Sequence, residues 1–417
     1  MSLLLRQPSF TYQMASVEQR DLVPDEKILS AIFPGATDIK LTSCCNIISN
    51  TFDTCTFSIH LEIAPLSGYP KDLLVRLETS GSRLATVAAL QRLGHAQLPN
   101  LIPSVLDVGT TTTADGTPVE YSVTAYCTGT ITLEDVWDTL GQPHQLESVD
   151  SVVHAMEKLQ KLDRNSEDVS RSLTGTPYVL NNGASDCMQS VRTSIGGPKL
   201  GYFPDVKQFL GGILRASNLK SPNCTLSEID DGIVLVSAFE DIGRVEFTRS
   251  DLDNLQHHVV FCHNDLEPRN ILVREISSAE GKSPQYELAA IIDWEMAGFF
   301  PFAYEYGLKD TVLGSSNLSF SWYSLFKERT SHLLPRAEYH TKLIKALKIV
   351  DESKKRSMTR NVGIRFQAKW VGREDVEKSL DLRRGWVRKA GAKPPGRFTK
   401  ADQANLELEV LKELGYL

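Results

Sequence analysis

The sequence predicts an α+β fold in two lobes, a small antiparallel β-rich lobe followed by a larger, mainly helical lobe. Three observations support this prediction. Short apolar runs with strand-like alternation occur in the first 125 residues, whereas later segments place apolar side chains at helical spacing. In the segment 259–292, two apolar runs flank a polar loop. This pattern is typical of two buried strands joined by a loop that carries functional residues.

The overall composition excludes several classes of protein. With 417 residues, 41% of them hydrophobic, the chain can bury a full core. Its net charge of −7 gives no general attraction to nucleic acid. The seven cysteines lack zinc-like spacing, which argues against both a disulfide framework and a structural metal. The first residues are too weakly apolar for a signal peptide, and no apolar run reaches about 18 residues. We therefore expect a cytoplasmic protein without a membrane partner.

The small lobe is expected at residues 25–124, after a loose lead-in at 1–24. Strict alternation at 56–63 places Phe57, Ile59, Leu61 and Ile63 on one face, as in a half-buried antiparallel strand. The expected elements are a helix at 24–33, strands at 39–43, 56–63 and 73–77, a helix at 83–93, and strands at 102–109 and 119–126.

The large lobe is expected at 125–350, with a helix under a Thr132 cap and another at 148–162. A basic extension packed on this lobe is expected at 351–417. From 353 to 400 there are 15 Lys and Arg against 4 Asp and Glu, so 15 − 4 gives a local charge of +11. Because Trp370 and Trp386 interleave with these charges, we favour the solvated face of an ordered extension over a nucleic-acid surface.

The polar loop has the residues that phosphoryl transfer needs. Asp265 is followed five residues later by Asn270, and Asp293 stands at the end of the next apolar strand. A carboxylate can accept or orient a hydroxyl proton, while amide and carboxylate oxygens are the hard ligands that magnesium prefers beside ATP phosphates. The pattern therefore predicts a kinase-type centre.

Residues 263–270 read His-Asn-Asp-Leu-Glu-Pro-Arg-Asn, and residues 291–295 read Ile-Ile-Asp-Trp-Glu. This composite resembles the aminoglycoside phosphotransferase/choline kinase-like family, which has a protein-kinase-like fold, and the wording is most similar to the fungal branch of that family. The resemblance implies transfer of a phosphoryl group from ATP, with Mg²⁺, to a hydroxyl of a small-molecule acceptor. No Ala-Pro-Glu motif follows Asp293, which argues against a protein acceptor.

The resemblance also implies roles for individual residues. Asp265 is expected to be the catalytic residue that accepts or orients the acceptor hydroxyl. His263 is placed beside it as a catalytic candidate, with a scaffolding role favoured over proton transfer. Asn270 and Asp293 are expected to bind the metal and the nucleotide. Glu295 could assist metal binding, orient Arg76, or be a surface residue without a role in the site.

The phosphate side departs from the family pattern. Arg76 stands where the family usually has a lysine that binds the nucleotide phosphates, and an arginine keeps the charge with a different head-group geometry. The following helix has Thr86 where a glutamate usually pairs with that cation. No glycine lies between Gly35 and Gly68, so the candidate phosphate turn at 45–51 must rely on groups such as Ser49 and Asn50.

Adenine is expected at the hinge between the lobes, where the resemblance places backbone groups of Thr124 to Tyr126. The Ser-, Thr- and Gly-rich region 164–225 is expected to line the acceptor pocket. Two alternatives to a kinase remain open, because fold does not fix function. One is a repurposed scaffold that carries out non-phosphoryl chemistry on a small molecule, and the other is an inactive kinase-like adaptor.

Overall fold

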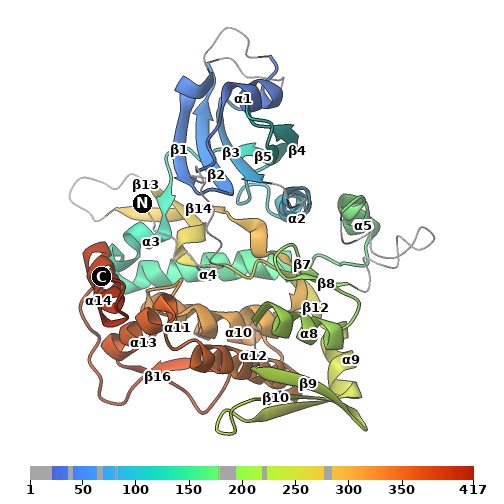
Figure 1. The fold of residues 1–417 in the computed structure, drawn as a ribbon, viewed down its shortest axis with the longest axis vertical. Coiled ribbons are helices and arrows are strands. Elements are labelled where there is room, and N and C mark those ends of the chain that lie inside the picture. The colour runs from blue at the N-terminus through green and yellow to red at the C-terminus, as the bar shows by residue number, and fades with distance from the viewer. Residues whose placement is uncertain are drawn as a thin grey trace.

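The computed structural model describes residues 21–35, 41–62, 69–79, 81, 83–176, 178, 194–217, 223–276 and 284–417. A small β-rich lobe stands above a larger lobe built mostly of helices (Figure 1). The predicted α+β architecture in two lobes is confirmed.

The small lobe is one five-stranded antiparallel sheet in the order β1-β2-β3-β5-β4. Its strands are β1 (Cys45–Asn50), β2 (Thr54–His60), β3 (Asp72–Thr79), β4 (Val105–Thr112) and β5 (Pro118–Ala125). Helix α1 (Glu26–Ile32) covers one face, and α2 (Leu84–Gln97) follows β3. Short turns join β1 to β2 and β4 to β5, whereas β3 is followed by α2, and β5 rather than β4 pairs with β3.

The alternation of β2 and β3 sets the two faces of this sheet. Phe57 and Ile59 of β2 are buried in the small-lobe core, together with Leu61, as predicted. Ile63 lies outside the described residues. On β3 the buried Leu73, Val75 and Leu77 alternate with Arg76 and Glu78. Because side chains alternate in a strand, Arg76 and Glu78 share the opposite face from this core.

Two local predictions in the small lobe are wrong. Of the strand expected at 39–43, residues 41–43 lie in a 3₁₀ helix, Leu41–Cys44, while 39 and 40 lie outside the described residues. The expected phosphate turn at 45–51 is mostly strand β1, and the turn comes later, between Asn50 and Thr54. The sequence 45–50 is rich in residues that suit an exposed edge strand, which is where β1 lies.

Helix α2 connects the two lobes. Its buried residues Ala89, Leu90 and Leu93 belong to the large-lobe core rather than to the core under the five-stranded sheet. Gly94 lies so close to Trp294 that a β-carbon at this glycine would approach the indole ring to 3.0 Å. The helix is thereby packed against the segment that carries Asp293.

The large lobe contains ten helices within the described residues. They are α3 (Leu133–Val136), α4 (Gln142–Leu159), α5 (Glu167–Leu173), α8 (Val206–Ser217), α9 (Arg249–His257), α10 (Phe302–Val312), α11 (Phe320–Thr330), α12 (Glu338–Ser357), α13 (Val362–Glu374) and α14 (Lys400–Glu413). As predicted, the side chain of Thr132 caps α3, accepting a hydrogen bond from the amide of Asp135. No helix in the described part has both the length and the apolarity to cross a membrane.

Small sheets position the polar loop. The strands β14 (Gln285–Ile291), β13 (Ile271–Ile276) and β6 (Ile131–Thr132) form one, and β12 (Val259–Cys262), β15 (Gly298–Pro301), β7 (Ile195–Gly197) and β8 (Gly201–Phe203) form another. A third contains β11 (Arg244–Thr248), β10 (Gly232–Ser237) and β9 (Cys224–Ile229), at the far end of the lobe (Figure 1). The loop 263–270 thus joins strands of the first two sheets.

The C-terminal extension packs on the large lobe. The boundary expected at 350/351 falls inside α12, which continues to Ser357. Phe366, Trp370 and Val410 form a buried cluster with Leu313 and Tyr323 of the lobe. A change of charge along the exposed face of a helix does not end the helix, so the composition shift marks no structural break here.

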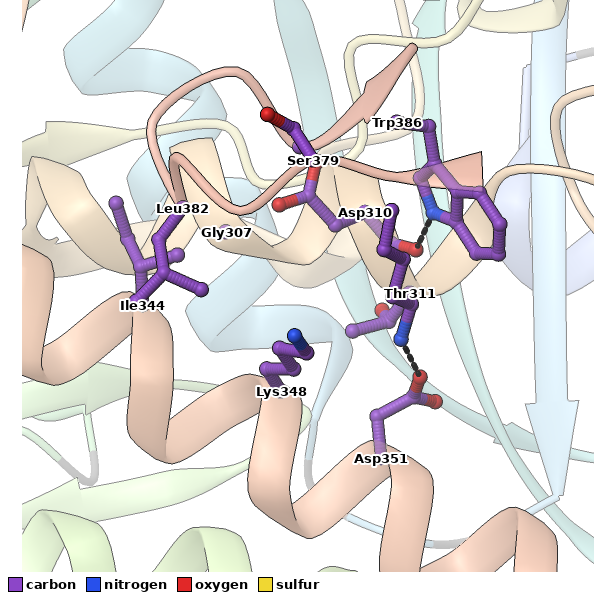
Figure 2. A pocket seen from close by; sticks show the side chains of 11 residues that line it. Gly307, Asp310, Thr311, Ile344, Lys348, Asp351, Ser379, Leu382 and Trp386 are labelled. Atoms are coloured by element: carbon purple, nitrogen blue, oxygen red, sulfur yellow. Dashed lines mark hydrogen bonds and ion pairs between the residues drawn. The ribbon is translucent and has the colours of Figure 1, made fainter. Parts of the chain in front are cut away.

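A hairpin of the extension, β16 (Val376–Lys378) and β17 (Trp386–Arg388), closes a pocket against α10 and α12 (Figure 2). The indole N–H of Trp386 donates to the carbonyl of Asp310 at 2.9 Å, and its backbone N–H donates to the Tyr323 hydroxyl at 2.7 Å. The pocket has an internal volume of about 20 Å³, room for about one water molecule. The hairpin is therefore closely packed on the lobe.

Many basic side chains of the extension are paired with carboxylates. Lys369 contacts Glu409 at 2.7 Å, Lys378 contacts Glu352 at 2.9 Å, and Lys400 contacts Asp135 of α3 at 3.0 Å. Because these cations meet acidic groups from neighbouring elements, much of the local positive excess is neutralised within the molecule. The arrangement is that of an ordered extension with a charged outer face.

His340 of α12 predicts an acid-sensitive stability. The side chain is buried, and neither ring nitrogen has a hydrogen-bond partner among the described residues. Burial, followed by the charges of His258 and Arg383, lowers its pKa to about 4. The folded state then binds fewer protons than the unfolded state between pH 4 and 6.5, so stability falls as pH decreases through this window.

We expect the wild type to lose about 3 kcal/mol more than His340→Phe between pH 7.5 and pH 4, measured by urea unfolding. Other titrating groups contribute equally to both proteins and cancel in the comparison. An identical pH dependence in the two proteins would contradict the role given to His340.

Candidate active site

The polar loop begins where β12 ends at Cys262 and finishes in a 3₁₀ turn, Pro268–Asn270, that leads into β13. Strand β14 ends at Ile291, and the amide of Ile292 donates to the carbonyl of Asn270 at 3.0 Å. Since β13 and β14 are antiparallel neighbours, the end of β14 returns to the start of β13. The loop and the segment 293–295 therefore lie side by side.

The side chain of His263 is buried, and each of its ring nitrogens makes a hydrogen bond to the backbone around the loop. Its Nε2 lies 3.0 Å from the carbonyl of Ile292, and its Nδ1 lies 3.3 Å from the amide of Asp265. A neutral ring satisfies both contacts, with Nε2–H donating and Nδ1 accepting. Burial lowers the pKa of His263 to about 4, which keeps the ring neutral near pH 7. This geometry matches a scaffolding role.

Asp265 is held by two neighbours from its own loop. Arg269 donates to both carboxylate oxygens at 2.7 Å, and Asn270 Nδ2 donates to one of them at 2.7 Å. Asn270 Nδ2 also reaches the backbone carbonyl of Asp265 at 2.9 Å. The Asp265 side chain is only 16% exposed, so its direction is fixed from several sides. Because the amide nitrogen of Asn270 is occupied by Asp265, its amide oxygen is left for another ligand.

Asp293 lies in the left-handed region, with φ 65° and ψ 69°. This conformation is rarely adopted by residues other than glycine and is found preferentially where structure is held for function. Its Oδ1 is buried without a hydrogen-bond partner among the described residues, and the closest cation, Arg76 Nη1, is 3.5 Å away. Burial, reinforced by the charge of Glu295, raises the pKa of the Asp293 carboxyl.

The oxygens of Asn270 and Asp293 fit a magnesium ion. A carboxylate oxygen that makes no hydrogen bond among the described residues and an amide oxygen are both hard ligands. Mg²⁺ in nucleotide sites is usually held by one or two carboxylates together with phosphates. Within the described ranges no group of three or more His, Cys, Asp or Glu side chains is arranged to bind a metal by itself. A magnesium ion held by Asn270 and Asp293 would therefore need further ligands, which phosphates could supply.

Glu295 is the centre of an ion-pair cluster that joins the lobes. Its Oε2 accepts from Arg76 Nη2 at 2.6 Å and from Arg83 Nη2 at 3.2 Å. Both arginines also contact Glu78, Arg76 through Nε at 2.9 Å and Arg83 through Nη2 at 2.8 Å. Of the readings open for Glu295, the contact with Arg76 at 2.6 Å fits the one in which it orients that arginine. Its role as a metal ligand stays a prediction.

Glu78 and Arg83 are site residues that sequence reasoning missed. The expected partner position on α2, Thr86, is buried and packed, and the carboxylates that pair with Arg76 come instead from Glu78 of β3 and from Glu295. The signal was available in the strand period, because Arg76 and Glu78 are two residues apart and share a face. Arg83 precedes the first residue of α2, so the turn after β3 carries it to the same cluster.

Ser49 and Asn50 lie at the end of β1, paired with Thr56 and Cys55 of β2. The turn that follows is closed without glycine, because Thr51 Oγ1 contacts Asp53 and accepts from the Thr54 amide at 3.1 Å. Ser49 is exposed and Asn50 is half-buried. Their contact with a nucleotide stays a prediction.

The hinge offers few free backbone groups. The amide of Tyr126 donates to Asp72 at 3.1 Å, its carbonyl accepts from Thr128 at 3.1 Å, and the amide of Ala125 donates to Ser104 at 3.2 Å. Thr124 is paired within the sheet, between Leu74 and Val105. Thr124 and Tyr126 are therefore placed at the lobe junction, but their polar backbone groups are largely engaged, and adenine binding there stays a prediction.

Buried charged side chains of helix α10 contact the loop. Lys309 Nζ contacts Glu267 Oε1 at 2.7 Å and donates to the carbonyl of Leu266 at 2.5 Å. Glu305, one turn earlier, accepts from the amide of Asn264 at 2.9 Å. All three charged side chains are at most 2% exposed. The loop residues on both sides of Asp265 are thus fixed to one helix.

The comparison with known families identifies the segment that contains this centre. Residues 225–309 match the phosphotransferase enzyme family. The matched range includes the loop 263–270, Asp293, Glu295 and the α10 residues that hold the loop. No curated protein matches the chain.

Several solved structures are similar over most of their length. Aminoglycoside 2′-phosphotransferase-IIIa in complex with GDP has 14% identity and a TM-score of 0.42, covering 91% of this chain and 99% of that one. The streptomycin–ATP ternary complex of APH(2″)-IIa has 11% identity and a TM-score of 0.38, covering 84% and 96%. Macrolide 2′-phosphotransferase MphH from Brachybacterium faecium has 12% identity and a TM-score of 0.34, covering 82% and 93%.

Proposed function

We propose that this protein transfers the γ-phosphoryl group of ATP to a hydroxyl of a small molecule, with Mg²⁺ bound at Asn270 and Asp293. The observation that carries the proposal is the buried Oδ1 of Asp293, beside Asn270 and Asp265, which makes no hydrogen bond among the described residues and has only a 3.5 Å ion-pair contact with Arg76. A left-handed residue with a buried oxygen that lacks a hydrogen bond is costly and is expected where a ligand completes the site. The match of residues 225–309 to a phosphotransferase family supports the same reaction. Membership of the fungal branch is part of this proposal.

We assign each residue a separate role that follows from its position in the site. Asp265, fixed by Arg269 and Asn270, accepts or orients the proton of the acceptor hydroxyl for in-line attack. Arg76 neutralises phosphate charge from the small-lobe side, as does Arg83. Mg²⁺ at Asn270 and Asp293 would bridge and neutralise the ATP phosphates. His263 holds the loop in the required shape.

The first test is calorimetric titration of Mg-ATP into the wild type and into Asp293→Ala. We expect binding by the wild type that requires magnesium, and a loss of affinity of tenfold or more in the variant, because a hard oxygen ligand has been removed. Asp241→Ala, which removes an exposed carboxylate paired with Arg356, serves as the matched control and should bind like the wild type.

The same titration separates the alternatives. Absence of Mg-ATP binding at millimolar concentration by a folded wild type would refute the kinase proposal and favour the repurposed scaffold or the adaptor. ATP binding that is equal in Asp293→Ala and in the wild type would place the nucleotide away from this centre. Once binding is shown, ADP release across a panel of hydroxyl-bearing small molecules identifies the acceptor class.

A further inference from the structure

The end of helix α10 is capped by a side chain of the C-terminal extension. The last carbonyls of a helix have no partner within the helix, so they need donors from elsewhere. Gln367 of α13 supplies them, because its Nε2 donates to the Thr311 carbonyl at 3.2 Å and also to the Leu313 carbonyl. Gln367 is only 5% exposed, so these contacts are shielded from water. The extension thereby fixes the point at which the chain leaves α10.

The turn that follows, residues 313–317, folds closely beneath Trp370 of α13. Gly314 has a φ of 78°, and a β-carbon at this glycine would lie 2.7 Å from the indole ring of Trp370. A residue with a side chain would be strained here in both respects. The amide of Gly314 donates to the Asn317 carbonyl at 2.7 Å, which closes the turn. The shape of the turn therefore depends on Gln367 and Trp370 of the extension.

The same turn contacts Arg269 of the loop 263–270. The Ser316 carbonyl accepts from Arg269 Nη1 at 2.5 Å, and Arg269 Nη2 donates to both carboxylate oxygens of Asp265 at 2.7 Å. A guanidinium is planar and rigid, so a carbonyl that fixes one of its nitrogens also fixes the direction of the other. The Arg269 side chain is 27% exposed, and a long side chain at such a place stays in one rotamer only when contacts hold it.

These contacts form a continuous path from the extension to the carboxylate of Asp265. The path runs from Gln367 through the turn 313–317 and Arg269. We propose that the C-terminal extension positions Asp265 for phosphoryl transfer, with Gln367 and Arg269 as the positioning residues. This inference rests on the proposed function. Phosphoryl transfer depends mainly on alignment, so a displacement of about 1 Å at Asp265 is enough to slow it.

A double-mutant cycle tests the coupling between Gln367 and Arg269, because a path of contacts alone does not demonstrate coupling. Gln367→Met removes the donor and keeps the length of the side chain, and Arg269→Met removes the guanidinium. The measurement is ADP release from Mg-ATP, with water or a compound of the panel as the attacking hydroxyl. The attacking oxygen bonds to the γ-phosphorus while the bond to the leaving ADP breaks, and the hydroxyl proton passes to Asp265.

We expect ADP release to fall on the order of tenfold in Gln367→Met and on the order of 10²-fold in Arg269→Met. The double variant should be no slower than Arg269→Met, because both changes interrupt one path. Mg-ATP affinity, measured by calorimetry, should stay within about threefold of the wild type in all three variants.

Two further variants separate positioning from other effects. Arg269→Lys keeps the charge but loses the planar guanidinium, so it should be nearly as slow as Arg269→Met. Lys369→Met breaks a surface ion pair between α13 and Glu409 and leaves Gln367 in place. This variant is the matched control for a change on α13 and should turn over normally.

Several results would overturn the inference. Losses that multiply in the double variant would show two independent effects. Normal turnover by Gln367→Met would mean that the extension does not influence Asp265, and normal turnover by Arg269→Lys would mean that only the charge matters. Weaker Mg-ATP binding by Gln367→Met would indicate a general disturbance of the site. A folded wild type that releases no ADP with water or any panel compound would reject the proposed function and this inference with it, whereas an active wild type separates the two questions.

Discussion

Asp265→Asn is expected to lower phosphoryl transfer by 10²- to 10⁴-fold while leaving Mg-ATP affinity within about threefold of the wild type. The carboxylate is oriented by Arg269 and Asn270, both at 2.7 Å, and it is not one of the two groups proposed to bind the metal. Asparagine keeps the shape but cannot accept a proton, and it faces the amide nitrogen of Asn270 with a changed hydrogen-bonding pattern. Chemistry is therefore lost and binding is kept.

ADP release with the acceptor found in the screen measures the first quantity, and calorimetry measures the second. Asp241→Asn, on the exposed surface, is the matched control and should turn over normally. Turnover within a few-fold of the wild type would remove Asp265 from the reaction. Loss of Mg-ATP binding together with turnover would instead move Asp265 into the nucleotide site.

Lys309→Met is expected to destabilise the protein by about 3–5 kcal/mol, the cost of leaving one member of a buried ion pair without its partner. Glu267 is 1% exposed, and Lys309 is its only partner for Oε1 among the described residues. The substitution also removes the donor to the Leu266 carbonyl. Burial already raises the pKa of Glu267, so without the lysine the carboxyl should protonate more readily.

Urea unfolding at pH 7 measures this loss. Lys369→Met breaks an exposed pair with Glu409 and should cost less than about 1 kcal/mol, which makes it the matched control. The double variant Lys309→Met/Glu267→Gln should recover part of the loss, because no uncompensated charge is left buried. A loss below about 1 kcal/mol for Lys309→Met would show that water reaches the pair and that α10 does not fix the loop through it.

The proximity of the candidate site residues could be predicted because they are close in sequence. His263, Asp265 and Asn270 lie within eight residues, and the strand pair β13–β14 returns the chain to place Asp293 beside them. A strand–loop–strand pattern in the sequence therefore predicts that these residues lie close together in space. Their places are as expected, and their roles stay predictions until the titrations are made.

The residues that were missed depend on contacts between distant segments. Arg83 reaches Glu295 only because the small lobe packs against the large lobe at this point. No periodicity or motif within one segment predicts a contact between segments that are distant in sequence. The turn expected at 45–51 failed for a different reason, because strand and turn propensities are both compatible with Cys-Asn-Ile-Ile-Ser-Asn, and pairing with β2 decides between them.

The packing of the C-terminal extension on the large lobe limits where the chain can be truncated. Helix α12 crosses the expected boundary without a break, and Trp370 and Phe366 cover Leu313 and Tyr323 of the lobe. A chain cut near residue 350 would expose this apolar surface and leave the helix open at its middle. We therefore expect the basic segment to unfold together with the lobe that carries the loop 263–270, rather than as a separate domain.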